Sequence, residues 1–133
     1  MHERLIFTLR GTPHFVQHET VSPQTLCTIP LDTQALSLEG SNVGDDELAV
    51  LPHLSALRCL DLDSTSVTDR SLAKIASLPA LEELWLEDTA VTDAGIRVLH
   101  GAASLRFVSL AYTAVTEFGV RELTAAIPGV VVT

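Results

Sequence analysis

The sequence predicts an α/β repeat solenoid with a parallel sheet on its concave side and helices on its convex side. Three observations lead to this fold class. Residues 33–133 repeat with a period of 24, each unit opens with alternating apolar residues, and each unit closes with apolar residues at helical spacing. A strand and a helix of this length cannot bury their own apolar sides, so the units must stack on one another.

The repeat is clearest in the units that start at residues 57, 81 and 105. Their sequences read LRCLDLDSTSVTDRSLAKIASLPA, LEELWLEDTAVTDAGIRVLHGAAS and LRFVSLAYTAVTEFGVRELTAAIP. A looser copy starts at residue 33, and residues 129–133 form a fragment that is predicted to be a final strand. The first copy has Gly44 where the others have Thr, and Thr33 where the others have Leu. Its coil is therefore expected to be irregular.

Each part of a unit has a physical reason, shown here for the unit that starts at residue 57. Leu60 and Leu62 alternate with polar neighbours, as a short strand with one buried face requires. Thr65 marks the end of the strand, where its hydroxyl can bond to nearby backbone groups. Thr68 then stands at a helix N-cap, and an acidic residue follows in the first turn. The unit is thus predicted to run strand, turn, helix.

These units resemble leucine-rich repeats, of the short kind that carries T-x-V-T-D-x-G-L in place of an asparagine loop. The resemblance covers residues 33–133. It implies a leucine-rich-repeat solenoid that recognises other proteins, and it names no particular partner.

Residues 1–32 do not repeat and are predicted to form an N-terminal capping segment. Leu5, Phe7 and Leu9 alternate as in a strand, residues 11–13 read as a turn, and residues 14–19 read as a returning strand. A capping β-hairpin is the expected structure, because a solenoid needs its end coils covered. An independent binding element is the alternative.

Composition limits the classes of partner. The 133 residues suit one domain; 47% are hydrophobic, only 5% are aromatic, and the net charge is −9. Nucleic acids and anionic membranes need Lys and Arg to displace counterions, so neither is expected as a partner. The charge favours another protein with a basic or mixed surface, although an acidic balance also simply keeps a small protein soluble.

The cysteines and the first residues point to a cytoplasmic location. Cys27 and Cys59 form neither a zinc-binding pattern nor a disulfide framework, so a reducing compartment is expected. The start, Met1-His2-Glu3-Arg4, is too charged for a signal peptide, and no long apolar run follows.

The outward positions of the strands are the candidate binding surface, here called the concave face. Side chains alternate along a strand, so the residues between the inward leucines point outward. Trp85 and Phe107 are one unit apart there, with carboxylates around them, and an aromatic anchor inside a polar rim is typical of protein-binding hot spots. Alternatively, the aromatic rings only pack on their cross-strand neighbours. The candidate residues are Glu39, Asp61, Asp63, Glu83, Trp85, Glu87, Asp88, Phe107, Ser109 and Tyr112.

No motif for catalysis is present, so an enzyme, a cofactor and a metal site are not expected. His14 and His18 have the spacing of metal ligands on a helix but fall in an expected strand. Asp61 and Asp63 could in principle hold calcium, but an acidic strand face is the more common meaning. Cys59 has no base assigned to it.

The predicted function is a protein-binding scaffold or adaptor that uses the acidic and aromatic concave face. The alternative is an acidic inhibitor or immunity-type protein that occludes a basic enzyme. The final strand, residues 130–132, would also present an apolar edge through which the chain could self-associate.

Overall fold

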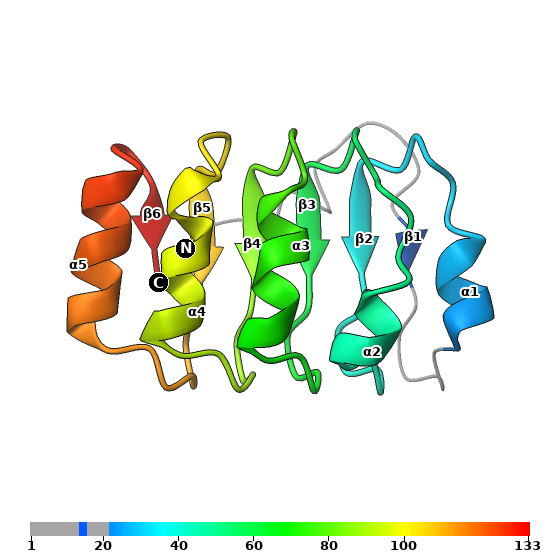
Figure 1. Cartoon of the computed structure of the whole chain (residues 1–133), viewed down its shortest axis with the longest axis horizontal. Coiled ribbons are helices and arrows are strands. Elements are labelled where there is room, and N and C mark those ends of the chain that lie inside the picture. Colours follow the sequence, from blue (N-terminus) through cyan, green and yellow to red (C-terminus); the bar gives the residue numbers. More distant parts are fainter. Residues whose placement is uncertain (1–13, 16–21) are drawn as a thin grey trace.

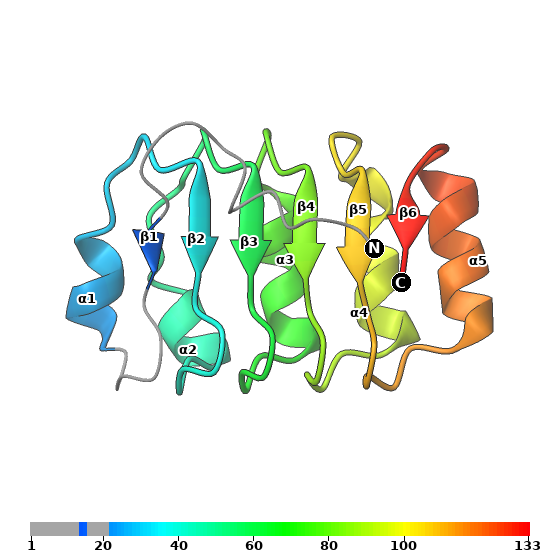
Figure 2. The same ribbon diagram turned by 180° about the vertical axis from the view of Figure 1, so that it is seen from behind.

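A single parallel sheet organises the chain. The structure is a computed structural model that describes residues 14–15 and 22–133, and in this part six strands pair in the order β1-β2-β3-β4-β5-β6. The helices all lie on one side of the sheet (Figures 1 and 2). The strands are β1 (His14–Phe15), β2 (Ala35–Ser37), β3 (Cys59–Asp61), β4 (Glu83–Trp85), β5 (Phe107–Ser109) and β6 (Val131–Val132).

One helical segment follows each strand from β2 to β5, and α1 precedes β2. The α-helices are α1 (Pro23–Cys27), α2 (Asp45–Leu48), α3 (Leu72–Ala76), α4 (Asp93–Val98) and α5 (Glu117–Ala126). Two 3₁₀ turns adjoin them: η2 (Asp69–Ser71) before α3 and η3 (Leu99–Gly101) after α4. The α/β repeat architecture predicted from the sequence is confirmed.

The strand register reproduces the 24-residue period without a slip. Ala35 pairs with Cys59, Cys59 with Glu83, Glu83 with Phe107, and Phe107 with Val131. Because side chains alternate, this register separates two sets of apolar residues. The inward leucines belong to one buried cluster between sheet and helices, and Ala35, Cys59, Trp85 and Phe107 form a second cluster. The two clusters lie on opposite faces of the sheet, so the second set lies on the concave face.

The main core is aliphatic and repeats with the units. Leu36, Leu60, Leu84 and Val108 are fully buried at equivalent positions of four neighbouring strands. Burying one such side chain contributes about 1.5–3 kcal/mol, so stacking several in register accounts for the stability that one unit alone lacks.

A ladder of aspartates joins each unit to the next one. The Asp69 carboxylate accepts hydrogen bonds from Thr92, at 2.8 Å from the amide and 2.6 Å from the hydroxyl. Asp45 bonds to Thr68, and Asp93 to Thr116, in the same way. The carboxylates therefore satisfy backbone amides at helix starts, which the helices themselves leave unpaired.

The hydrogen bonds of this ladder lower the pKa of two carboxyl groups, those of Asp45 and Asp93. Burial raises the pKa of Asp45, but the bonds from Ser71 and Thr68 outweigh burial and hold that pKa below its ordinary value. The two bonds from Thr116 hold the pKa of Asp93 below its ordinary value as well. Both carboxylates are thus stabilised in the charged form.

The N-terminal part differs from the rest of the array. β1 pairs with β2 in parallel, and α1 begins after Ser22, whose hydroxyl accepts a hydrogen bond from the Thr25 amide. The helix α1 was not predicted from the sequence. The predicted capping hairpin involves residues 1–13 and 16–21, which lie outside the described residues, so it stays a prediction.

The first unit is irregular, as Gly44 suggested. Its helix, α2, has only four residues, and Gly44 provides no side-chain bond at the N-cap. Thr68 and Thr116 do provide such bonds at the equivalent positions, whereas Thr92 does not. None of the helices in residues 22–133 is long and apolar enough to cross a membrane.

Candidate protein-binding site

The ten candidate residues differ in their exposure to solvent. Trp85 and Phe107 are 6% and 3% exposed, so the aromatic pair is buried rather than presented as a free anchor. Three carboxylate residues and one serine are buried with them: Asp61, Asp63, Glu83 and Ser109. Glu39 and Glu87 are half-buried, whereas Asp88 and Tyr112 are exposed. A place on the concave face therefore does not amount to exposure to solvent.

The buried aromatic pair forms a rigid backing for this surface. The ring centroids of Trp85 and Phe107 are 4.9 Å apart and the rings are tilted by 44°. The Trp85 Nε1–H donates to Glu83 Oε1 at 2.6 Å, so its polar atom has a partner inside the buried cluster. The contact corresponds to the alternative considered from the sequence, in which the aromatic rings pack on their cross-strand neighbours.

The accessible part of the surface lies where the strands end, and we call it the acidic rim. The rim is a hollow of about 470 Å³, lined by Glu39, Asp63, Ser64, Glu87, Asp88 and Tyr112. Five of these six residues were among the sequence candidates. Asp63 is buried behind the other three carboxylates, and a hollow of this charge attracts Lys or Arg side chains of a partner.

Hydrogen bonds hold the carboxylates of the rim in place. Asp63 Oδ1 accepts from the Glu87 amide at 2.8 Å, and Glu87 Oε2 accepts from the Ser109 hydroxyl at the same distance. The Ser64 hydroxyl donates to Asp88 Oδ2 at 3.1 Å. Each bond joins two neighbouring units, so a partner would meet an ordered set of oxygens.

One column of the repeat has a left-handed backbone at the rim. Gly40, Ser64, Asp88 and Tyr112 occupy equivalent positions, with φ of 69°, 54°, 54° and 59°. Only glycine adopts this conformation without cost, and a bulky residue is unusual there. Ser64 was missed by the sequence analysis, although its alignment with Asp88 and Tyr112 at 24-residue spacing would have identified it.

Tyr112 is the large aromatic residue that this surface offers to solvent. Its side chain is 85% exposed, so little packing within the protein offsets its strained backbone. The same left-handed turn recurs at Ser64 and Asp88, so the exposed ring, rather than the backbone, distinguishes Tyr112 from its equivalents in the other units.

The described residues give no sign of a metal centre. Within 14–15 and 22–133, no three His, Cys, Asp or Glu residues are placed to hold a metal ion. Cys27 and Cys59 are not joined in a disulfide.

Comparison with known proteins supports the fold. No family model matches the chain, and no curated protein matches it in sequence. Among solved structures, it is similar to the crystal structure of an internalin (inlF) from Listeria monocytogenes, a leucine-rich-repeat protein, with a TM-score of 0.56. The fold is a leucine-rich-repeat solenoid.

The likeness to the internalin extends no further than the fold. The two chains are 14% identical over 85% of this chain, and the match spans only 37% of the internalin chain. A fold does not by itself determine function, which depends on the side chains that the individual array presents.

Proposed function

We propose that the protein is a binding scaffold or adaptor that recognises a basic or mixed protein surface through the acidic rim. The observation that carries the proposal is Tyr112, which is 85% exposed at a strained backbone position beside four carboxylates. An exposed aromatic ring next to a charged hollow offers apolar contact and charge pairing to one partner. In this proposal, the concave face as a whole supports the site, and the protein carries out no reaction of its own.

The buried members of the candidate set have a supporting role in this proposal. Trp85 and Phe107 hold the surface behind the rim, since their rings pack on each other. Removing either ring would disturb the sheet itself, so a loss of binding in such a variant would not identify the contact surface. The test therefore uses Tyr112.

The test compares wild type with Tyr112→Gly as baits for proteins of the native host. Glycine relieves the left-handed strain, roughly 1–2 kcal/mol, and adds some freedom to the unfolded chain, so the variant should be as stable as wild type or about 0.5 kcal/mol more stable. The matched control is Phe118→Ala, which removes another exposed aromatic ring (59%) on α5, on the helical side of the sheet. Partners should be retained by the control and lost from Tyr112→Gly.

The opposite pattern would contradict the proposal: proteins held by Tyr112→Gly and lost from Phe118→Ala would place binding on the helices. The salt dependence then separates the adaptor from the alternative, an inhibitor of a basic enzyme. Association with a basic enzyme is steered by charge and should slow steeply as ionic strength rises, whereas an interface centred on Tyr112 should be less sensitive.

A cytoplasmic location is part of the same proposal. The separate thiols of Cys27 and Cys59 are compatible with a reducing compartment.

A further inference from the structure

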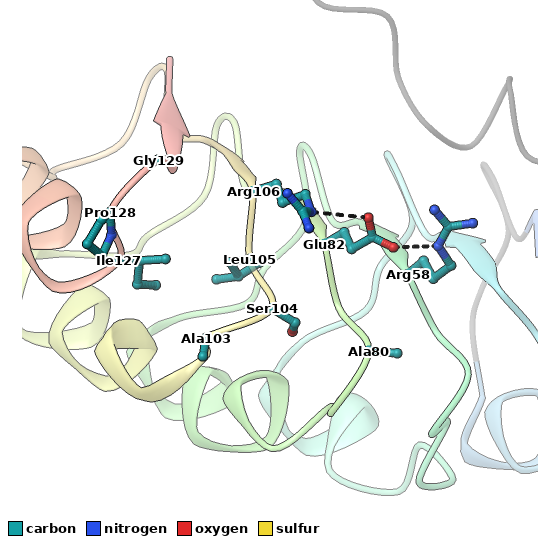
Figure 3. A pocket seen from close by; sticks show the side chains of 10 residues that line it. All are labelled: Arg58, Ala80, Glu82, Ala103, Ser104, Leu105, Arg106, Ile127, Pro128 and Gly129. Carbon is teal, nitrogen blue, oxygen red and sulfur yellow. Dashed lines mark hydrogen bonds and ion pairs between the residues drawn. The ribbon is translucent and has the colours of Figure 1, made fainter.

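A second charged surface lies at the opposite edge of the sheet, where the strands begin. Arg58, Glu82 and Arg106 precede β3, β4 and β5 and are each 24 residues apart. The Arg58 Nε lies 2.5 Å from Glu82 Oε2, and the Arg106 Nε lies 3.6 Å from Glu82 Oε1 (Figure 3). One carboxylate is thus shared between two guanidinium groups.

This sharing leaves a local surplus of one positive charge. The other arginines of residues 22–133 each have a carboxylate of their own: Arg70 with Asp46, Arg97 with Glu122, and Arg121 with Glu117. Lys74 donates to the backbone carbonyl groups of Ala49 and Leu51. On a chain of net charge −9, the strand-start edge is the place within the described ranges where two arginines share one carboxylate.

The surplus charge borders a groove of about 470 Å³. Leu105 and Ile127 are nearly buried in its wall, and Ala80 and Ala103 add further apolar surface. In Figure 3 the arginines lie toward one end of the groove, and Ile127 and Pro128 lie at the other. The groove therefore combines a cationic end with an apolar end.

The arginines retain hydrogen-bonding capacity at this edge. Both guanidinium groups face Glu82 through Nε, and no described residue accepts a hydrogen bond from their Nη atoms. The Arg106 side chain is 81% exposed, so a ligand can reach it. A guanidinium group presents its donors in a planar fork that matches the two oxygens of a carboxylate.

We propose that this groove binds an acidic peptide segment of a partner protein, with a carboxylate on Arg106 and Arg58 and an adjacent apolar side chain against the exposed Ala103 and Pro128. A single surplus charge matches one carboxylate. The net charge of −9 disfavours a polyanion such as a nucleic acid, which needs many cations. The groove is separate from the acidic rim, because the strands are parallel and the two surfaces lie at their opposite ends.

The probe is the peptide acetyl-Ala-Leu-Glu-Ala-amide, titrated against the full chain at low salt while the amide signals of Arg106 and Gly129 are followed by NMR. The control peptide carries Gln in place of Glu. We expect saturable shifts at these two amides, with binding roughly fivefold weaker for the Gln peptide and for Arg106→Gln, the scale of one exposed charge pair. Arg97→Gln makes the same charge change at a matched ion pair and should leave binding unchanged.

Glu82→Gln gives a result of opposite sign. It removes the competing carboxylate, so the acidic peptide should bind roughly threefold or more tightly. Circular dichroism of each variant confirms that it is folded. The proposal is overturned if a folded Glu82→Gln protein binds more weakly, if both peptides bind equally, or if the acidic peptide causes no shift at about 10 mM, the range expected for so small a ligand.

Discussion

Replacing Gly95 by alanine tests the aspartate ladder directly. A Cβ atom at this position would lie 2.1 Å from Asp69 Oδ1 and 2.5 Å from its Cγ, closer than real contacts allow. The carboxyl group would have to rotate away and give up its bonds to the Thr92 amide and hydroxyl. Gly95 therefore leaves room for the side chain that joins two units.

The magnitude follows from the bonds that are lost. A hydrogen bond to a charged group contributes about 1.5–3 kcal/mol, and two such bonds are broken. Against this loss, alanine stabilises α4 by about 0.5–1 kcal/mol relative to glycine, because it is the better helix former. Asp69 is partly exposed, so the lower value of about 1.5 kcal/mol applies to each hydrogen bond. We therefore expect Gly95→Ala to lower the free energy of unfolding by about 2 kcal/mol.

Urea unfolding at pH 7, followed by far-ultraviolet circular dichroism, measures this change. Gly101→Ala is the matched control, because a Cβ there meets nothing within 4 Å. An Asp69→Ala background removes the carboxyl group and leaves only the contact with the Cβ of residue 69, at 2.9 Å, so the loss caused by Gly95→Ala should be much smaller there. A neutral Gly95→Ala, or a loss of the same size in both backgrounds, would refute the reasoning.

The preceding unit gives an internal comparison. Ser71 stands at the position of Gly95, and its hydroxyl donates to Asp45 Oδ1 at 2.6 Å. Its helical segment begins with the 3₁₀ turn η2, whereas α4 starts directly as an α-helix. Gly95→Ser should accordingly cost less than Gly95→Ala, because the new hydroxyl can bond to Asp69.

Two further predictions concern the first junction and the open edge. Asp45→Asn should lower the free energy of unfolding by about 1 kcal/mol at pH 7. The pKa of Asp45 is lower in the folded state than in the unfolded state, so wild type loses this advantage as the pH falls from about 5 toward the folded pKa. Urea unfolding curves of the two proteins should therefore converge in acid. Among the described residues β6 is the last strand of the sheet, and Val131 is 54% exposed. Wild type should therefore self-associate at high micromolar concentration in analytical ultracentrifugation, and Val131→Lys should not. A monomeric wild type would count against that edge as an interface.

The repeat made the fold predictable, because its period sets the strand register. Leu60 and Leu84 align in the sequence, and they pair in the sheet. The Asp of each unit was assigned correctly to a helix start, but only as a favourable charge there. Its bonds to the Thr 23 residues later depend on the stacking distance between coils, which the sequence of one unit does not contain.

The exposure of the candidate site was harder to predict than its position. Alternation places Trp85 and Asp61 on the concave face, but burial depends on what surrounds each side chain in three dimensions. The helix α1 was also missed, although Ser22 followed by Pro23 is a typical helix start. Short helices of this kind owe more to their packing than to their sequence.

The Asp-to-Thr bonds run in the same sense at each of the three junctions described, from Asp45 to Thr68, Asp69 to Thr92, and Asp93 to Thr116. Each unit thus brings an acceptor for the unit after it and a donor for the unit before it. A tandem duplication of 24 residues would supply both halves of the new junction at once. The array can consequently lengthen by copying a single unit, with no compensating substitution elsewhere in the protein.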